Sequence, residues 1–389
     1  MRVLMLVATS VATDTRVLRE AGGLVAAGHT VHIIGKSVPQ GFEPGTGITV
    51  SSVGTSSVFR GEQGASLSGR RLSWPARVGR WLLLPQHRNS AFHRWADGAY
   101  ADASARTFDV VHAHDFTALG AGARLARERG VPLVYDSHEL WTGVPREYRP
   151  TPLQDRRERR QEAEWGGRAA AVITVGPGVA DALRSQYGWA NVAVARNTFP
   201  LLPEAELPVL PEHPRGAVYA GRVGAYRELE VIAAASREVP LPITIVGPGD
   251  GTWLTTFDAG RATVLPALSL DDVSRAIAHA GLALVTHSDR WPNHRLAMPN
   301  KLFHAVSLGV PVVATDVGQL GELVREHRLG VLYRPGDAAS LADAVRRAQA
   351  EYPQLVRQVR EARPRLSWPE DEAELRRVYG TLGIDPRVG

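Results

Sequence analysis

The stretch PNKLFHAVSLGVPVVAT, residues 299–315, decides the fold class of this 389-residue chain. Its pattern predicts a loop, a short helix that begins near Asn300 and stops at Gly309, and a buried strand over Val310–Thr315. A helix that follows a strand-exit loop has free backbone N–H groups at its N-terminus, and the helix dipole adds positive potential there. The stretch therefore predicts one unit of an α/β protein with an anion site where the helix begins.

The same alternation of short apolar runs and helix-length segments continues through the whole chain. In the first half, helix Asp14–Ala27 is expected among these strands: Arg2–Ala8, His29–Gly35, Phe108–His114, Val131–His138, Ala170–Val175 and Val192–Arg196. In the second half, the expected strands are Gly216–Arg222, Pro242–Gly247, Ala262–Pro266, Gly281–His287, Val310–Asp316 and Gly330–Tyr333. The helices expected between these strands are Arg227–Glu238, Leu270–Ala280, Gly318–His327 and Asp337–Ala350. This pattern is typical of parallel sheets that helices cover on both faces.

Five prolines between Asn197 and Arg215 interrupt the alternation, because proline at this density continues neither helices nor strands. We therefore expect a Rossmann-like domain at residues 1–200, a linker at 201–215 and a second Rossmann-like domain at 216–365. The last segment, 366–389, is expected to return to the first domain as helix Pro369–Leu382. Since ligands bind outside the carboxyl ends of strands in open α/β sheets, the cleft between the two domains is the expected site.

The composition narrows the class of protein. The chain is 44% hydrophobic and 22% charged, as in ordinary globular proteins, and it has no cysteine, which excludes disulfides and thiolate chemistry. There is no run of eighteen apolar residues, and the N-terminus lacks the order of a signal peptide, so a cytoplasmic location is expected. Lysine occurs only at Lys36 and Lys301 among the 45 basic residues, an arginine bias that is typical of GC-rich coding.

The sequence also lacks several functional motifs. It contains no Walker A, no His-Glu-x-x-His and no Asp-x-Asp in a strand-exit loop, so neither a metal nor a cofactor is expected. The positive charge comes without a nucleic-acid-binding motif, and no nucleic-acid partner is expected. Residues 60–94 hold seven arginines and one acid, Glu62. This segment fits a peripheral contact with an anionic membrane, an acceptor-side lid, or a plain surface with solvated arginines. The oligomeric state is not predicted.

Several short motifs occur in a fixed order along the chain. They are Asp14-Thr15-Arg16-Val17 with Glu20, Gly28-His29, His112-Ala113-His114-Asp115, Tyr135-Asp136-Ser137-His138-Glu139, Gly221-Arg222 with Arg227, Val246-Gly247-Pro248-Gly249, the block Pro299–Gly309, and Ser367-Trp368. Together they resemble the GT4 family of retaining glycosyltransferases, which implies the GT-B fold, with two Rossmann-like domains that face each other across a cleft. The chain departs from the family at the usual pair of glutamates, which are Leu296 and His304 here.

The resemblance implies that the second domain binds a nucleotide sugar, with UDP or GDP as its nucleotide. Arg222 and Arg227 would hold the diphosphate as it leaves. The residues expected to contact the nucleotide are Gly221, Gly247, Leu268, Pro299, Asn300, Lys301, Leu302 and His304. Those expected near the sugar are Asn293, His294 and Leu296. Leucine at 296 suits a deoxygenated or substituted sugar, and His304 either makes a weakened ribose contact or is a core or surface histidine.

The first domain would bind the acceptor through Thr13, Asp14, His114 and Asp115. His138 is expected to bond a hydroxyl of the transferred sugar, Asp136 to brace its own turn, and His112 to be structural. The resemblance implies transfer with retention and without metal. A small specialised metabolite is the favoured acceptor, while a lipid-linked glycan and a thiol stay open. The alternatives are a nucleotide-sugar 2-epimerase of the same fold and a non-catalytic nucleotide-sugar binder.

Overall fold

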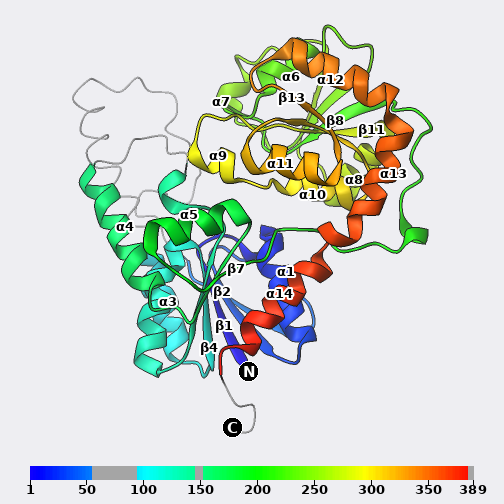
Figure 1. Cartoon of the computed structure of the whole chain (residues 1–389). Helices are drawn as coiled ribbons and strands as arrows, with labels where there is room; N and C mark the ends of the chain where they lie inside the picture. The colour runs from blue at the N-terminus through cyan, green and yellow to red at the C-terminus, as the bar shows by residue number, and fades with distance from the viewer. Residues whose placement is uncertain (55–93, 145–151, 384–389) are drawn as a thin grey trace.

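The structure is a computed structural model that describes residues 1–54, 94–144 and 152–383. The chain forms two lobes, each built on its own parallel sheet (Figure 1). The arginine-rich segment 60–94 lies outside the described residues, apart from its last residue. Within the described residues, no helix is long and apolar enough to cross a membrane.

The first lobe contains a seven-stranded sheet in the order β3-β2-β1-β4-β5-β6-β7, in which all the pairings are parallel. Its strands are β1 Arg2–Val7, β2 Thr30–Gly35, β3 Ile48–Ser52, β4 Val110–His114, β5 Leu133–Ser137, β6 Ala171–Thr174 and β7 Val192–Val194. Its helices are α1 Thr15–Ala26, a helical segment at 94–104, α3 Asp115–Arg129, α4 Pro152–Gly166 and α5 Pro177–Tyr187.

The second lobe contains a six-stranded parallel sheet in the order β10-β9-β8-β11-β12-β13. Its strands are β8 Gly216–Ala220, β9 Ile243–Val246, β10 Thr263–Leu265, β11 Gly281–Val285, β12 Val312–Thr315 and β13 Gly330–Tyr333. Its helices are α6 Leu229–Ala235, α7 Gly251–Leu254, α8 Leu270–Ala280, α9 Pro292–Leu296, α10 Asn300–Ser307, α11 Gly318–His327, α12 Ala338–Ala350 and α13 Tyr352–Ala362.

Each sheet is buried on both faces, as parallel sheets with helical crossovers must be. Along β1, Leu4 and Leu6 pack into one apolar cluster, whereas Val3, Met5 and Val7 pack into another on the opposite face. This alternation follows from the two-residue period of a strand. The near-continuous apolar runs in the sequence therefore come from burial on both sides, and the predicted α/β class with two Rossmann-like sheets is confirmed.

Helix α6 is shorter than the predicted helix Arg227–Glu238. It begins only at Leu229, because Tyr226 and Glu228 have left-handed backbone angles, with φ of 64° and 59°. Non-glycine residues adopt this conformation at a cost of about 1–2 kcal/mol each. Arg227 is therefore on a constrained loop and not on the helix.

The chain crosses between the lobes twice, and the two crossings lie side by side. Phe199, on the outgoing segment, forms a bridge with Ser367 on the returning one, and its carbonyl accepts from Trp368 N–H at 2.8 Å. Helix α14, Trp368–Gly380, then packs against α1 and β7 of the first lobe (Figure 1). Asp371 on this helix accepts from the Arg196 guanidinium at 2.9 Å and from Thr198 Oγ1 at 2.6 Å.

Candidate functional site

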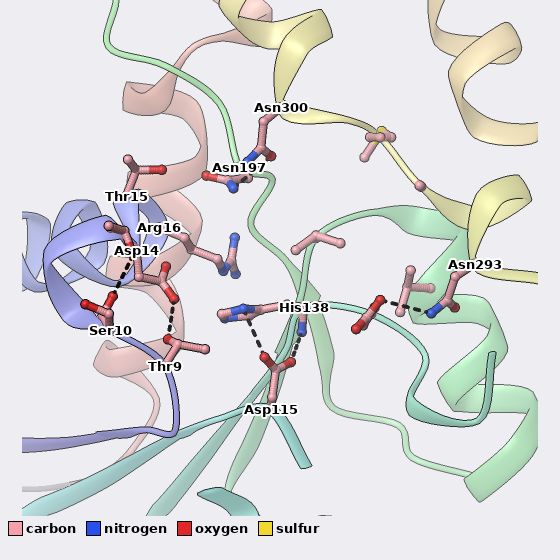
Figure 2. A pocket seen from close by; sticks show the side chains of 16 residues that line it. Thr9, Ser10, Asp14, Thr15, Arg16, Asp115, His138, Asn197, Asn293 and Asn300 are labelled. Atoms are coloured by element: carbon pink, nitrogen blue, oxygen red, sulfur yellow. Dashed lines mark hydrogen bonds and ion pairs between the residues drawn. The ribbon is translucent and has the colours of Figure 1, made fainter. Parts of the chain in front are cut away.

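A pocket of about 550 Å³ lies between the lobes, at the carboxyl ends of the strands of the first sheet (Figure 2). The first lobe and the outgoing crossing supply most of its lining: Thr9, Ser10, Thr13, Asp14, Thr15, Arg16, Asp115, His138, Glu139, Val175, Val179 and Asn197. The second lobe supplies Asn293, Ala297, Met298 and Asn300. Of the predicted site residues, the pocket thus brings together Thr13, Asp14, Asp115, His138, Asn293 and Asn300.

The loop between β1 and α1 gives the pocket a wall of hydroxyl groups. Asp14 caps α1 by accepting from Val17 N–H at 3.3 Å, and its other oxygen accepts from Thr9 Oγ1 at 3.0 Å. The cap satisfies an otherwise unpaired helix N–H and fixes where the chain turns into the helix. The loop therefore holds Thr9, Thr13 and Thr15 along one side of the pocket.

A buried ion pair joins two of the elements that form the pocket. Arg16 on α1 donates to both oxygens of Asp136 at the end of β5, at 2.8 and 2.7 Å, and to the carbonyl of Ala195 at 2.7 Å. Burial alone would raise the pKa of Asp136, but Arg16 and the neighbouring histidines hold that pKa well below its usual range. Asp136 was expected to brace its own turn; instead it joins β5 to α1, because the guanidinium reaches it from another element.

His138 lies between two carboxylates. Its Nε2 is 2.9 Å from Asp136 Oδ2, its Nδ1 is 3.3 Å from Asp115 Oδ2, and its backbone N–H donates to Asp115 Oδ1 at 3.0 Å. Burial lowers the pKa of this imidazole, but Asp115 and Asp136 more than offset that effect and raise the pKa to about 10. With this pKa His138 is an imidazolium near pH 7; its Nε2 donates to Asp136, and its Nδ1 forms an ion pair with Asp115. A hydroxyl of a bound sugar would therefore meet a charged ring whose donors are already engaged.

Two further histidines lie beneath His138. His114 was predicted to face the acceptor, but its side chain is fully buried, with Nδ1 3.1 Å from Asp136 Oδ2, and it does not line the pocket. His114 can therefore affect a molecule in the pocket only through the residues that it contacts. His112, predicted to be structural, is also fully buried, and its Nδ1 is 2.9 Å from the hydroxyl of Tyr379 on α14. Helix α14 is thus hydrogen-bonded to one of these two buried histidines.

Four of these buried side chains, Glu20, His112, His114 and Asp136, place one ligand-type atom each within 4.8 Å of the others. Arg16 already contacts both carboxylates, at 2.9 Å from Glu20 and 2.7 Å from Asp136. Burial raises the pKa of Glu20 to about 7, although Arg16 opposes this. A metal ion here would have to compete with the guanidinium for the same oxygens.

Two amide groups of the second lobe reach across the pocket. Asn293 on α9 donates to Glu139 Oε2 at 3.2 Å and to the carbonyl of Leu140 at 3.0 Å. Asn300, the first residue of α10, accepts from Asn197 Nδ2 at 2.8 Å. Figure 2 shows Asn293 and Asn300 at separate positions around the pocket. These hydrogen bonds connect the second lobe to the rest of the pocket lining at two places on the rim of the pocket.

Apart from Asn293 and Asn300, the residues predicted at the donor site do not line this pocket, and three of them are engaged elsewhere. His294 is buried with Nδ1 2.7 Å from Ser288 Oγ, and Leu296 packs against the apolar cluster of the first lobe. His304 stacks on Phe199 with ring centroids 4.8 Å apart, and its Nε2 is 2.8 Å from Ser274 Oγ. Burial lowers the pKa of His304 to about 4, so its ring is neutral near pH 7.

Arg227 and Lys301 bring two positive charges together. Lys301 Nζ lies 4.3 Å from the centre of the Tyr219 ring, and burial together with Arg227 lowers the pKa of Lys301 to about 7. In the part of the chain that the structure describes, neither cation has a carboxylate within 4.0 Å. Arg222, predicted to act with Arg227, is exposed, and its carbonyl accepts from the Tyr219 hydroxyl at 3.0 Å. Arg227 is within electrostatic range of both Lys301 and Glu139.

The backbone around these cations is fixed. Thr286 Oγ1 donates to the carbonyl of Arg227 at 2.7 Å, which holds the constrained loop against β11. Helix α10 begins after Pro299 with no side chain capping its N-terminus. The N–H of Leu302 donates to the carbonyl of Pro299 at 2.9 Å, and the Leu302 side chain is in the core, so a ligand contact predicted for Leu302 would have to share that N–H.

Two predicted glycines meet where β8 and β9 end. A Cβ on Gly247 would lie 1.8 Å from the carbonyl oxygen of Gly221, so only glycine fits at 247. A Cβ on Gly221 would lie 3.6 Å from Lys301 Cε. Leu268, predicted near the base, is 41% exposed in the loop after β10. The glycines thus allow close backbone packing beside the cations.

Several pocket residues were not predicted as site residues, chiefly Glu139, Asn197 and the hydroxyls of Thr9, Ser10 and Thr15. Glu139 directly follows His138 at the exit of β5, and this position at a strand end could have identified it as a candidate site residue. Asn197 has no comparable signal, because it belongs to the crossing segment and meets the pocket only through the arrangement of the lobes.

Comparison with known families agrees with this architecture. Residues 13–200 match the family described as Glycosyltransferase Family 4, and residues 215–351 match Glycosyl transferases group 1. The chain belongs to glycosyltransferase family 4. The two matches divide at the proline-rich crossing, so each covers one lobe of the GT-B fold.

Curated members of this family are moderately similar. A glycogen synthase of Mycobacterium tuberculosis is 28% identical over 278 residues, which cover 67% of this chain and 64% of the relative. A D-inositol 3-phosphate glycosyltransferase of Nocardia farcinica is 28% identical over 279 residues, which cover 61% of this chain and 58% of the relative. The match therefore spans less than two thirds of the length of either relative.

Solved structures share the fold of this family member over nearly its full length. Sucrose-phosphate synthase from Thermosynechococcus elongatus superposes with a TM-score of 0.74 at 18% identity and covers 98% of this chain and 99% of that one. HepE of Anabaena, in complex with UDP-glucose, gives a TM-score of 0.66 at 15% identity and covers 98% of this chain and 100% of that one. These likenesses confirm the predicted GT-B fold.

Proposed function

We propose that this chain transfers a sugar from a nucleoside diphosphate sugar to an acceptor held in the pocket between the lobes. One observation carries the proposal: Arg227 and Lys301 lie together at the strand ends of the second sheet with no carboxylate partner among the described residues. Two like charges in a confined place favour an anion between them. The uncapped N-terminus of α10 adds backbone donors at the same place.

The chemistry of the leaving group explains why such a pair is useful. When the bond between the anomeric carbon and the diphosphate oxygen breaks, negative charge accumulates on the phosphate. Cations already in position stabilise this charge without reorganising, and removing one such donor typically costs about 10²–10³ in turnover. Lys301 and Arg227 would carry this role, and Arg222 would join them if its side chain turns toward the ligand.

We propose transfer with retention and without metal, as the family resemblance implies. An acceptor hydroxyl would approach the anomeric carbon on the face from which the diphosphate leaves. The new carbon–oxygen bond forms as the old one breaks, and the acceptor proton passes to the departing phosphate oxygen. This route needs no separate base. It leaves His138 to hold Asp115 and Asp136 in place at the floor of the pocket.

The donor and the acceptor can be proposed at different levels of detail. UDP and GDP are both candidate nucleotides, and a HepE structure of the same fold, in complex with UDP-glucose, supports UDP. On the acceptor side, the hydroxyls of Thr9, Ser10, Thr13 and Thr15 favour a polar, hydroxylated molecule. A small specialised metabolite fits the pocket of about 550 Å³.

The proposal is tested by nucleotide binding and then by turnover. UDP, GDP, TDP and ADP are ranked by thermal shift, and the best nucleotide is offered as its sugars to a panel of hydroxylated acceptors with release of the diphosphate as the readout. We expect Lys301→Met to abolish the shift and Lys36→Met, at the only other lysine, to preserve it. Absence of any nucleotide binding would overturn the proposal. A new nucleotide sugar formed without acceptor would show an epimerase, and binding without any product would indicate a non-catalytic binder.

A further inference from the structure

Among the described residues, three carboxylates line the pocket, and in two of them each oxygen already has a partner. Asp14 accepts from Val17 N–H and Thr9 Oγ1, one on each oxygen. Asp115 accepts from the backbone N–H of His138 with one oxygen and lies 3.3 Å from its Nδ1 with the other. In both groups, each oxygen already has a partner in the loop or in His138.

The third carboxylate, Glu139, is different. Its Oε2 accepts from Asn293 Nδ2 at 3.2 Å, and its Oε1 has no partner among the described residues. The backbone beneath it is held, because the Glu139 carbonyl accepts from Ser137 Oγ at 2.9 Å. Glu139 therefore presents one unused acceptor oxygen to the pocket from a fixed position.

The surroundings of Glu139 place it between the two halves of the site. Asp115 and His138 of the first lobe lie on one side, and Arg227 and Asn293 of the second lobe are near enough to act on its charge. Although the side chain is exposed to the pocket, burial by neighbouring groups and the Asp115 charge raise the pKa of Glu139 to about 7. The Arg227 charge lowers the pKa of Glu139, so this carboxylate lies within electrostatic range of one of the two cations.

The second lobe offers no carboxylate to the pocket, since its lining residues are Asn293, Ala297, Met298 and Asn300. The transferred group of a nucleotide sugar carries hydroxyls that must find acceptors when they lose water, because a buried unpaired hydroxyl costs about 1–3 kcal/mol. We propose that Glu139 accepts a hydrogen bond from a hydroxyl of the transferred sugar and selects donors that carry a hydroxyl at that position. This inference rests on the proposed function.

The test compares each nucleotide sugar with its own free nucleotide. Isothermal titration gives the affinities of wild type, Glu139→Gln and Glu139→Leu for UDP and UDP-glucose, and for GDP and GDP-mannose. We expect both variants to lose about 10-fold or more in affinity for the bound nucleotide sugar, since hydrogen bonds to charged groups contribute about 1.5–3 kcal/mol. Free nucleotide affinity should change less than about two-fold, which also shows that the variants are folded. Glu361→Gln, at an exposed acid of α13, is the matched control.

A second readout follows from the charge of Glu139. In wild type, the preference for nucleotide sugar over free nucleotide should increase from pH 6 to pH 8 as Glu139 loses its proton, and it should be flat in Glu139→Gln. Unchanged preference in both variants, or equal loss for sugar and nucleotide, would overturn the inference while leaving the proposed function intact. If wild type binds no nucleotide at all, the proposed function fails, and this inference fails with it.

Discussion

The Arg16 guanidinium bonds both oxygens of Asp136, and each of these side chains is at most 3% exposed. Arg16 belongs to the first helix and Asp136 to the end of β5, so the pair joins elements that are far apart in the sequence. Asp136 also contacts His114 and His138. One carboxylate thus sets the positions of the groups that form the floor of the pocket.

Breaking this pair should destabilise the first lobe strongly. Arg16→Met leaves Asp136 buried without its main partner, and loss of one member of a buried pair costs about 3–5 kcal/mol. Arg2→Met is the control, because the Arg2–Asp109 pair is partly exposed and such pairs contribute only about 0–1 kcal/mol. Urea unfolding followed by circular dichroism gives both free energies. Equal losses for the two variants would contradict the assignment.

Nucleotide binding should take up protons at mildly alkaline pH. The pKa of about 7 leaves Lys301 mostly neutral at pH 8, whereas a diphosphate beside it favours the charged form. Binding should therefore draw up to about one proton from the buffer. Calorimetry at pH 8 in Tris and in HEPES, whose ionisation enthalpies differ, measures this number. Lys301→Arg, whose side chain stays charged at pH 8, should bind without this uptake. Proton release in wild type would contradict the lowered pKa of Lys301.

Arg227 should matter more than Arg222 for holding the nucleotide. Arg227 shares its site with Lys301 on a constrained loop, while Arg222 is exposed. We expect Arg227→Met to lower turnover by about 10²–10³, the usual cost of losing such a donor, and Arg222→Met to have a smaller effect. Turnover and free-nucleotide affinity are measured for both. A larger effect at Arg222 would show that its side chain moves to the ligand.

Gly247 should tolerate no side chain. A Cβ at 247 would lie 1.8 Å from the Gly221 carbonyl oxygen, so Gly247→Ala forces the ends of β8 and β9 apart. Overpacking of this kind costs about 1–3 kcal/mol, and the shift should also weaken nucleotide binding at neighbouring Lys301. Gly224→Ala is the control, because its Cβ would meet only an ordinary contact at 3.6 Å. Thermal unfolding of both variants measures the loss of stability, and nucleotide titration measures the loss of affinity.

Leu296→Glu tests whether position 296 influences the choice of sugar. The side chain packs against the first lobe, so an added carboxylate either reaches the sugar or loosens that contact. We expect the ranking of a panel of nucleotide sugars to change, with Leu296→Met, which keeps the apolar contact, retaining the wild-type ranking. An unchanged ranking in Leu296→Glu would place 296 outside the sugar site.

The sheets could be predicted from the sequence because strands buried on both faces are continuous apolar runs. The predicted and observed strands agree to within two residues at most ends, and Gly330–Tyr333 agrees at both. Strand β3, Ile48–Ser52, was missed, since an edge strand with exposed and polar positions lacks that signal. Helix α9 was missed because it has only five residues, too few for a helical period to be visible.

The candidate site was predictable only in part. Residues at strand ends, such as His138 and Asp115, could be found because parallel strands bring their carboxyl ends to one edge. The contacts between lobes could not, since the Asn293–Glu139 and Asn197–Asn300 bonds depend on how two separately folded units are placed. The direction in which the side chains of His304 and Leu296 point could not be predicted either, because each packs against a surface formed by distant segments.

The paired crossings at Phe199 and Ser367 also restrict how the two lobes can separate. Both connections run together on one side of the molecule, and α9 lies toward the other (Figure 1). Opening would therefore turn one lobe about this double connection as a pivot. The Asn197–Asn300 bond, close to the pivot, would move little, whereas the Glu139–Asn293 bond is farther away and would part first. A substrate would then enter from the rim beside Glu139, and the same carboxylate would meet it on the way in.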